Sequence, residues 1–420
     1  MPSRVLRRRA ATAFGIYGSA LLGFAATIVA ARELSKPDFA RFALVFGTTS
    51  LLQLFVDLTI DEVVVKYGNR YAAREQWGRF QRLFRVGLAV KMAGGAAGSL
   101  AVVGAALLAP WIWTTGGLRG AMLVAAFIPF LQQPEGMAGA VLLVRNRYDL
   151  RGMLLLWAMA LRLTAIVVGA SISLIGLFVA VVVAQVVSTL TGCTLALAVF
   201  RRYPAAAPAP LAEDAPEIRR FAVQSTVASG LLSLRTSLPT VLVGVVASPT
   251  QTADFRAAQA PATAGASLSA PARLVLLAEQ TRDFEQGRGD RALRLLGRYI
   301  GATAGLACVV TPLVWWAMPT LVRWVYGLKW VGAANAFRVM LLAAMLQLVF
   351  AWTKTFPVSI GRPGLRTLGQ LLEILVLVPA VVVLASLYGA TGAAAGVVAG
   401  AVVLAAFWSL RLAGVRRELT

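Results

Sequence analysis

The stretch that decides the fold runs from Ile218 to Gln280. It reads IRRFAVQSTVASGLLSLRTSLPTVLVGVVAS (218–248), then PTQTAD (249–254), then FRAAQAPATAGASLSAPARLVLLAEQ (255–280). Two apolar segments of membrane-spanning length lie on either side of a short polar break. Each carries an arginine within its apolar run, Arg235 in the first and Arg273 in the second. Because a charged side chain at the bilayer centre costs about 2.5–3.5 kcal/mol on insertion scales, these arginines indicate a cavity lined by protein or water.

The first of these segments also carries hydroxyl side chains at helical spacing. They recur every three or four residues, so they share one face of a helix. They are Ser225, Ser229, Ser233, Thr236 and Thr240. Two interpretations stay open, namely a polar face toward a cavity and a set of small side chains that lets helices pack closely. A similar stripe of small and polar residues, from Thr12 through Gly15 to Thr27, lies on the first apolar run.

The composition is that of a polytopic membrane protein. Of the 420 residues, 59% are hydrophobic and 14% are charged, whereas soluble domains contain about 25% charged residues. The net charge of +22 is therefore expected mostly in loops on one side of a membrane, not on a nucleic-acid-binding surface. The sequence has no histidine, two cysteines without metal-ligand spacing and no P-loop motif, so we expect no metal site, disulfide framework or ATPase.

Twelve apolar runs predict about twelve transmembrane helices in an all-α fold. Their approximate limits are 10–31, 39–60, 86–109, 120–144, 152–171, 174–200, 221–247, 254–279, 299–320, 333–356, 368–388 and 391–412. The short connection at 173–176 leaves a re-entrant hairpin open as an alternative for the fifth and sixth runs. Basic residues alternate between the two sets of loops, 27 on one side and 7 on the other, which predicts cytoplasmic termini by the positive-inside rule.

The runs fall into two groups of six. The longest linker, RRYPAAAPAPLAEDAPEIRR (201–220), separates an N-terminal lobe, 1–200, from a C-terminal lobe, 221–420. A shift of 216 residues places Asp38-Phe39 on Asp254-Phe255, in agreement with the order of spans and loop charges. Six spans per half give both halves the same orientation, which predicts two pseudo-symmetric lobes related by an axis along the membrane normal.

Several charged residues lie inside the runs. Arg162 stands in the middle of its span, whereas Lys91 is close enough to a span end to extend its ammonium group to the surface. Glu135 follows Pro134, which removes a backbone donor and kinks a helix. We interpret Glu135 either as a proton or sodium site or as the partner of a nearby arginine. Asp57, near the end of the second span, is a second candidate for ion coupling.

Five further segments resemble a known family in their order and spacing. They are ARELSKPDFARFALVFG (31–47), EQGRGDRALRLLGRYI (285–300), LVRWVYGLKWVGAANAFRVMLLAAMLQ (321–347), SIGRPGLRTLGQ (359–370) and LYGATGAAAGVVAGAVV (387–403). In these the chain resembles the bacterial polysaccharide (O-antigen type) flippases of the multidrug/oligosaccharidyl-lipid/polysaccharide exporter superfamily. The resemblance implies two six-helix lobes around a central cavity lined by the first, second, seventh and eighth spans. It also implies translocation of undecaprenyl-diphosphate-linked oligosaccharide by alternating access.

We therefore expect a flippase, not an enzyme, that moves an O-antigen, exopolysaccharide or capsule repeat unit from the inner to the outer leaflet of the bacterial cytoplasmic membrane. The side chains expected to bind the anionic cargo are Arg235, Arg273, Arg162, Arg256, Arg41, Ser229, Ser233 and Thr236. Glu135 and Asp57 are the candidates for coupling to a proton or sodium gradient, and we expect no cofactor. The alternatives are a cation-coupled drug or metabolite antiporter of the same superfamily and a membrane scaffold or enzyme of glycan synthesis.

The expected partners follow from this interpretation. They are the lipid-linked oligosaccharide, membrane lipids, and the polymerase and glycosyltransferases of the same pathway. We expect a monomer and no binding of nucleic acid.

Overall fold

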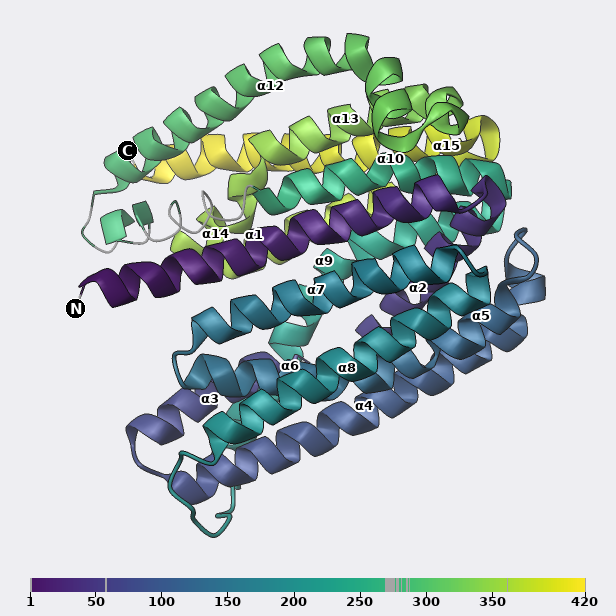
Figure 1. Ribbon diagram of the computed structural model, residues 1–420. Helices are drawn as coiled ribbons and strands as arrows, with labels where there is room; N and C mark the ends of the chain where they lie inside the picture. Colours follow the sequence, from purple (N-terminus) through teal and green to yellow (C-terminus); the bar gives the residue numbers. More distant parts are fainter. Residues whose placement is uncertain are drawn as a thin grey trace. The chain divides into compact units, whose positions relative to one another are not determined.

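The computed structural model describes residues 2–56, 59–268, 276, 279–280, 282–284, 286, 288–360 and 362–419. Within these residues every regular element is a helix (Figure 1). Among the described residues, seven helical segments are long and apolar enough to cross a membrane. The all-α membrane fold predicted from the sequence is therefore confirmed.

In the described part of the chain, each predicted span corresponds to a helix. The first six are α1 (Pro2–Glu33), α2 (Lys36–Val56), α4 (Trp77–Ile112), α5 with α6 (Leu118–Ala125 and Phe127–Val144), α7 (Tyr148–Ala170) and α8 (Leu174–Phe200). The others are α9 (Ala215–Val246), α10 (Pro249–Leu268), α12 (Gly289–Tyr326), α13 (Ala334–Val349) and two arms of α15 (Pro363–Leu419). Short elements connect them: α3 (Ile60–Ala73), η1 (Leu328–Ala333), η2 (Ala351–Lys354) and α14 (Phe356–Ser359).

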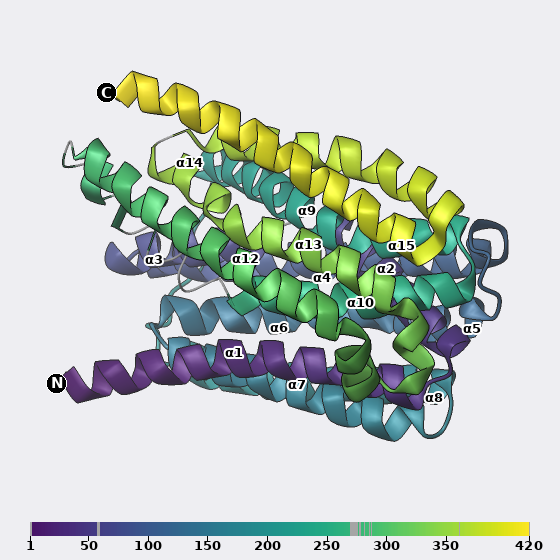
Figure 2. The same ribbon diagram turned by 90° about the horizontal axis from the view of Figure 1, so that it is seen from above.

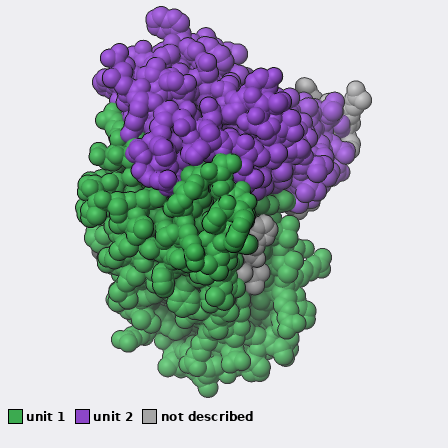
Figure 3. Space-filling view, turned by 90° about the vertical axis from the view of Figure 1, so that its right-hand side faces the viewer, with its two compact units in different colours: residues 1–34, 44–237 green, residues 35–43, 238–420 purple. Residues whose placement is uncertain are grey.

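Contacts divide the chain into two compact units, coloured separately in Figure 3. Unit 1 comprises residues 1–34 and 44–237, and unit 2 comprises residues 35–43 and 238–420. The division falls inside two helices, since α2 and α9 each contribute one part to each unit. The lobe limits taken from the sequence, with a linker at 201–220, remain a prediction.

In unit 1, α1 runs alongside α7 (Figures 1 and 2). The two backbones approach closely at Gly15, where a Cβ atom would stand 2.6 Å from the Cα of Gly152 and would overlap its carbonyl group. The stripe of small residues on the first span therefore packs against a neighbouring helix. At the far end of α7, Ser173 begins α8 by accepting a hydrogen bond from the backbone N–H of Gly176. Both α7 and α8 have spanning length, which does not support the re-entrant alternative.

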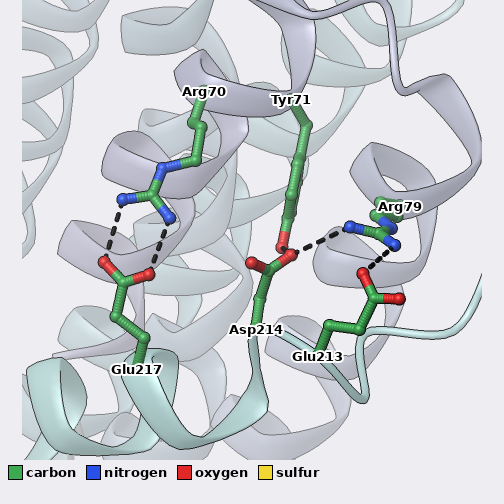
Figure 4. Close-up of polar contacts among 6 residues, drawn as sticks. All are labelled: Arg70, Tyr71, Arg79, Glu213, Asp214 and Glu217. Atoms are coloured by element: carbon green, nitrogen blue, oxygen red, sulfur yellow. Dashed lines mark hydrogen bonds and ion pairs between the residues drawn. The ribbon is translucent and has the colours of Figure 1, made fainter.

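Side chains hold the linker that follows α8 against α3 and α4 (Figure 4). Arg79 contacts the carboxylates of Glu213, at 2.6 Å, and Asp214, at 3.3 Å. The Tyr71 hydroxyl donates to Asp214 at 2.7 Å, and burial together with this hydrogen bond raises the pKa of Tyr71. The segment predicted as an extended connector is thus irregular in structure but fixed at its end to α3 and α4.

In unit 2, the start of α2 packs with α10 and η1. The Lys36 ammonium group pairs with Asp254 at 2.7 Å, and the ring of Phe39 lies edge-on to Trp330 at 5.1 Å between centroids. Both phenylalanines of the internal repeat, Phe39 and Phe255, are fully buried. The repeated Asp-Phe pair is therefore part of the packing of this unit.

The eleventh and twelfth predicted spans meet at Gly389, whose φ of 60° interrupts helical geometry within α15. The side-chain oxygen of Gln251 accepts a hydrogen bond of 2.7 Å from the backbone N–H of Ala390, just after this break. A left-handed φ is accessible to glycine without steric cost, so Gly389 allows the chain to turn between the two arms.

Candidate functional site

Unit 1 contains a polar cavity of about 240 Å³ among its helices. Residues of α2, α3, α4, α6, α7 and α8 line it. The lining includes three cations (Lys91, Arg151 and Arg162), two acids (Asp61 and Glu135), and several amides, among them Gln53, Gln132 and Gln185. With all of these groups ionised, the lining carries an excess of one positive charge.

Glu135 belongs to a hydrogen-bonded network between α6 and α8 that has Gln185 at its centre. Its carboxylate accepts a hydrogen bond of 2.7 Å from the side-chain amide of Gln185. The Gln185 side-chain oxygen in turn accepts from Gln132 at 3.3 Å. On the next turn of α8, the Thr189 hydroxyl donates to the backbone carbonyl of Leu131 at 2.7 Å. These contacts fix the position of a carboxylate in a helix that contains Pro134.

Arg162 and Glu135 line the same cavity, so the structure brings together two of the predicted site residues. The guanidinium carbon of Arg162 lies 5.3 Å from the ring centroid of Phe46, within the range of a cation–π interaction. Within the described part of the chain, Arg162 forms no ion pair within 4 Å. The charge of Arg162 is therefore available to a ligand in the cavity.

Two other lining residues, Lys91 and Asp61, form an ion pair. The Lys91 ammonium group lies 2.5 Å from a carboxylate oxygen of Asp61, and the Lys91 side chain is 4% exposed. The expectation that Lys91 extends to the surface is wrong, because a carboxylate from α3 meets it inside the unit. Asp61 also lies against Gly136, where a Cβ atom would come within 3.2 Å of its side-chain oxygen.

Arg151 is a third cation in the lining of this cavity. It stands on the first turn of α7, and its guanidinium group packs on Gly139 of α6. A Cβ atom at this glycine would come within 2.7 Å of the arginine Nε. The glycine therefore makes room for the planar guanidinium group at the edge of the cavity.

The hydroxyls of α9 have mixed environments. Thr226 accepts a hydrogen bond of 3.1 Å from the backbone N–H of Thr59, and Ser225 bonds Glu62 on α3. The Thr236 hydroxyl donates to the backbone carbonyl of Ser233 in its own helix at 2.9 Å. Part of the hydroxyl face therefore serves the contact between α9 and α3. Arg235 is half-buried on the same helix, in unit 1.

Two predicted arginines lie in unit 2. Arg41 pairs with Asp38 at 2.7 Å, one turn earlier on α2. Arg256 donates to the side-chain oxygen of Gln259 at 2.9 Å, and the Thr240 hydroxyl donates to the same oxygen at 3.0 Å. These contacts hold the side chains in place and leave the Arg256 charge without a counter-ion among the described residues.

The other predicted site residues are not placed. Arg273 and Asp57 lie outside the described residues, and the Ser229 side chain is not described. The predicted convergence of Arg235 with Arg273 therefore remains a prediction.

Sequence reasoning missed several side chains that line the cavity. Gln185 is a single amide in the apolar run LFVAVVVAQVVS (177–188), a signal comparable to a buried charge. Asp61 directly follows the predicted second span, and its partner Lys91 is thirty positions away in the chain. No local pattern connects two such residues.

The comparisons with known proteins agree with this architecture. The polysaccharide biosynthesis protein family matches residues 5–277. An inward-facing multidrug resistance MATE family transporter of the MOP superfamily is similar, with a TM-score of 0.79 and 12% identity, over 95% of this chain and 96% of that one. The lipid II flippase MurJ, in an inward closed conformation, has a TM-score of 0.70 and 11% identity over 95% of this chain and 87% of its own.

A third similar structure is a MOP superfamily transporter from Pyrococcus furiosus. It has a TM-score of 0.61 and 12% identity, covering 99% of this chain and 95% of that one. At such identities the likeness shows the fold, which is that of a multi-pass membrane transporter. No curated protein sequence matches the chain.

Proposed function

Because the chain belongs to the polysaccharide biosynthesis protein family, we propose that it is a flippase for an undecaprenyl-diphosphate-linked oligosaccharide. It moves an O-antigen, exopolysaccharide or capsule repeat unit from the inner to the outer leaflet of a bacterial cytoplasmic membrane by alternating access. It performs no bond chemistry. The membrane fold and the family membership support translocation of a glycan precursor, and the chemistry of the unit 1 cavity supports an anionic cargo.

The observation that carries this proposal is the excess of cation over acid inside the cavity. Arg151, Arg162 and Lys91 face a space where Glu135 and Asp61 are the acids. Guanidinium groups bind phosphate oxygens through paired hydrogen bonds, which suits a diphosphate headgroup. At about 240 Å³ the cavity is smaller than the roughly 300–1,000 Å³ typical of ligand pockets, so we assign to it the diphosphate and not the sugars.

The competing function is a cation-coupled drug antiporter, which the likeness to a MATE family transporter favours. A cationic cargo would be bound best by a lining in which acids predominate. Here Arg162 and Lys91 counter the two acids, and Arg151 adds a further positive charge. The charge balance therefore favours the anionic cargo. A membrane scaffold or enzyme of glycan synthesis remains the candidate from a different class.

Further arginines are proposed to guide the headgroup. We assign this role to Arg235 and Arg273, and to Arg41 and Arg256 where α2 and α10 begin. Ser233, Thr236 and Ser229 are proposed to contact the polar part of the cargo on α9. Glu135, held by Gln185, is proposed to couple transport to a proton or sodium gradient, with Asp57 as a second group.

A transport assay tests the proposed function. The full chain is reconstituted in liposomes with an undecaprenyl-diphosphate oligosaccharide, and a sugar-cleaving enzyme outside reports the fraction that has crossed. We expect Arg162→Ala to reduce the rate about tenfold or more, because a charged hydrogen bond contributes about 1.5–3 kcal/mol. Arg162→Lys should retain part of the activity, and Arg201→Ala, at an exposed site after α8, should have no effect.

The same liposomes distinguish the alternatives. Uptake of a cationic dye with no movement of the glycan lipid would establish the antiporter. Normal glycan movement in both Arg162→Ala and Arg235→Ala would disprove the cationic-cavity mechanism.

Both termini are proposed to be cytoplasmic. In a variant with Cys193 and Cys308 replaced by serine, a cysteine introduced at Ala206 of the linker should react with a membrane-impermeant reagent only from the cytoplasmic side. Labelling of intact cells at this position would reverse the assigned orientation.

A further inference from the structure

Unit 2 contains a second polar cavity, of about 450 Å³, at the start of α12. It shares no lining residue with the cavity of unit 1. Five of its eight lining residues are arginines and two are acids. The full lining is Glu279, Arg282, Asp283, Arg288, Arg291, Arg294, Leu295 and Arg298.

The acids neutralise only part of this charge. The carboxylate of Asp283 is nearly buried, and it contacts Arg288 at 3.2 Å and Arg291 at 3.7 Å. Among the residues that the structure describes, Arg282, Arg294 and Arg298 have no ion pair. All five guanidinium-bearing side chains are exposed. Asp283 therefore fixes two arginines in position, and the cavity retains a net positive charge facing solvent.

The arginines are arranged on one surface of α12. Arg291, Arg294 and Arg298 are separated by three and four residues, so they share a helix face. Arg288 immediately precedes the helix. Neighbouring guanidinium groups of this kind can enclose one phosphate group with several donors, which a single surface arginine cannot do.

The length of α12 places this face at the level of lipid headgroups. The helix has 38 residues and is therefore roughly 57 Å long, whereas the hydrocarbon core of a bilayer is about 30 Å thick. Its apolar part follows Arg298, in the sequence YIGATAGLACVVTPLVWWAM (299–318). The first three turns consequently extend beyond the hydrocarbon, at the depth where phosphates of the adjoining leaflet lie.

We propose that this cavity binds the phosphate headgroup of an anionic phospholipid in the leaflet at which α12 begins. Basic clusters directly outside a membrane span attract anionic lipids, and the fixed pair of Arg288 and Arg291 on Asp283 adds a defined shape to that attraction. The proposed flippase activity does not enter the argument. The lipid serves as a bound ligand of the protein and not as its cargo.

The test uses the full chain and short-chain phosphatidylglycerol in phosphatidylcholine nanodiscs. We expect Arg294→Ala/Arg298→Ala to weaken binding of this lipid about thirtyfold. Each arginine near the headgroups contributes a roughly equal binding free energy, so the factor is the combined effect of removing two of them. The matched control is Arg201→Ala/Arg202→Ala, which removes two exposed arginines at the end of α8 and should leave the affinity unchanged.

Other outcomes would overturn the proposal. Equal losses in the two double variants would mean that the lipid responds only to overall charge. Inorganic pyrophosphate that binds the wild type more tightly than the short-chain lipid would make this a site for free phosphates.

A folding control accompanies the binding measurement. An unchanged melting temperature of Arg294→Ala/Arg298→Ala would show that the loss is not due to misfolding. If that variant melts at a lower temperature, Arg294→Lys/Arg298→Lys must still bind the lipid measurably more weakly than wild type, although with a smaller loss, because lysine keeps the charge but cannot form the paired hydrogen bonds.

Discussion

Arg70 donates two parallel hydrogen bonds to the carboxylate of Glu217, with nitrogen–oxygen distances of 2.8 and 2.9 Å (Figure 4). The pair joins α3 to the first turn of α9, 147 residues further along the chain. These hydrogen bonds from Arg70 lower the pKa of Glu217 from 4.5 to about 2. The contact therefore joins the end of the linker to α3.

The first prediction concerns the pH dependence of this pair. Since the pKa of Glu217 is lower in the folded protein, its stabilising effect is complete above pH 4.5 and is lost as the pH falls toward 2. We expect Glu217→Gln to melt at a lower temperature than wild type at pH 7, with the difference shrinking below pH 4.5. Glu33→Gln, at an exposed end of α1, should show neither effect. A difference that stays constant down to pH 3 would contradict the prediction.

The second prediction concerns the contact between α1 and α7. A methyl group at Gly15 would overlap the Gly152 backbone, so Gly15→Ala must separate the two helices. We expect the free energy of unfolding in detergent to fall by about 1–3 kcal/mol, the usual cost of overpacking. Gly104→Ala in α4, where no atom lies within 4 Å of the added methyl group, is the matched control and should not be destabilised. Equal stability of the two variants would show that α1 does not approach α7 this closely.

The third prediction concerns the Lys91–Asp61 pair. Lys91→Met leaves the Asp61 carboxylate without its partner at the cavity, and we expect a loss of about 2 kcal/mol. This is less than for a fully buried pair, because the Asp61 side chain is 39% exposed. Adding Asp61→Asn should recover most of the loss. If the double variant is as unstable as Lys91→Met alone, the loss of stability comes from the packing of the lysine stem and not from the unpaired carboxylate.

The order of the spans was predictable from the sequence for a physical reason. A bilayer requires long apolar runs, and the positive-inside rule sorts the loops, so both signals are local and additive. The prediction covered even the break between the last two runs, where Gly389 supplies a φ of 60°. The assignment of residues to the two compact units was harder to predict, because the helix α9 contributes residues to both units.

The site was predictable only in part. Arg162 and Glu135 could be chosen as candidates because a charge in an apolar run is locally conspicuous, and their roles stay predictions. Arg151 was missed because it stands on the first turn of α7, where sequence cannot distinguish a loop charge from one that faces a cavity. Gln185 was missed because an uncharged amide scarcely changes the hydropathy of its run. The contact of Gln185 with the Glu135 carboxylate depends on the packing of α6 against α8.

The last prediction rests on the proposed function and concerns Glu135. Its carboxylate receives a hydrogen bond of 2.7 Å from Gln185 and shares the cavity with Arg162. In Glu135→Gln the side chain keeps its shape but can no longer bind and release a proton or neutralise the charge of a sodium ion. Under an imposed gradient, we expect glycan-lipid transport to fall about tenfold or more, to the rate seen without a gradient. Binding of the cargo should be nearly unchanged, because the cations of the cavity remain.

Two further variants make the result specific to the carboxylate. Gln185→Leu removes the donor but keeps the charge, so the gradient should still accelerate transport, although less than in wild type. Glu33→Gln should leave the gradient response unchanged, because this acid is exposed at the end of α1. If Glu135→Gln still responds to the gradient as wild type does, the charge on the cargo itself must carry the coupling, since a membrane potential acts on any charge that crosses the bilayer.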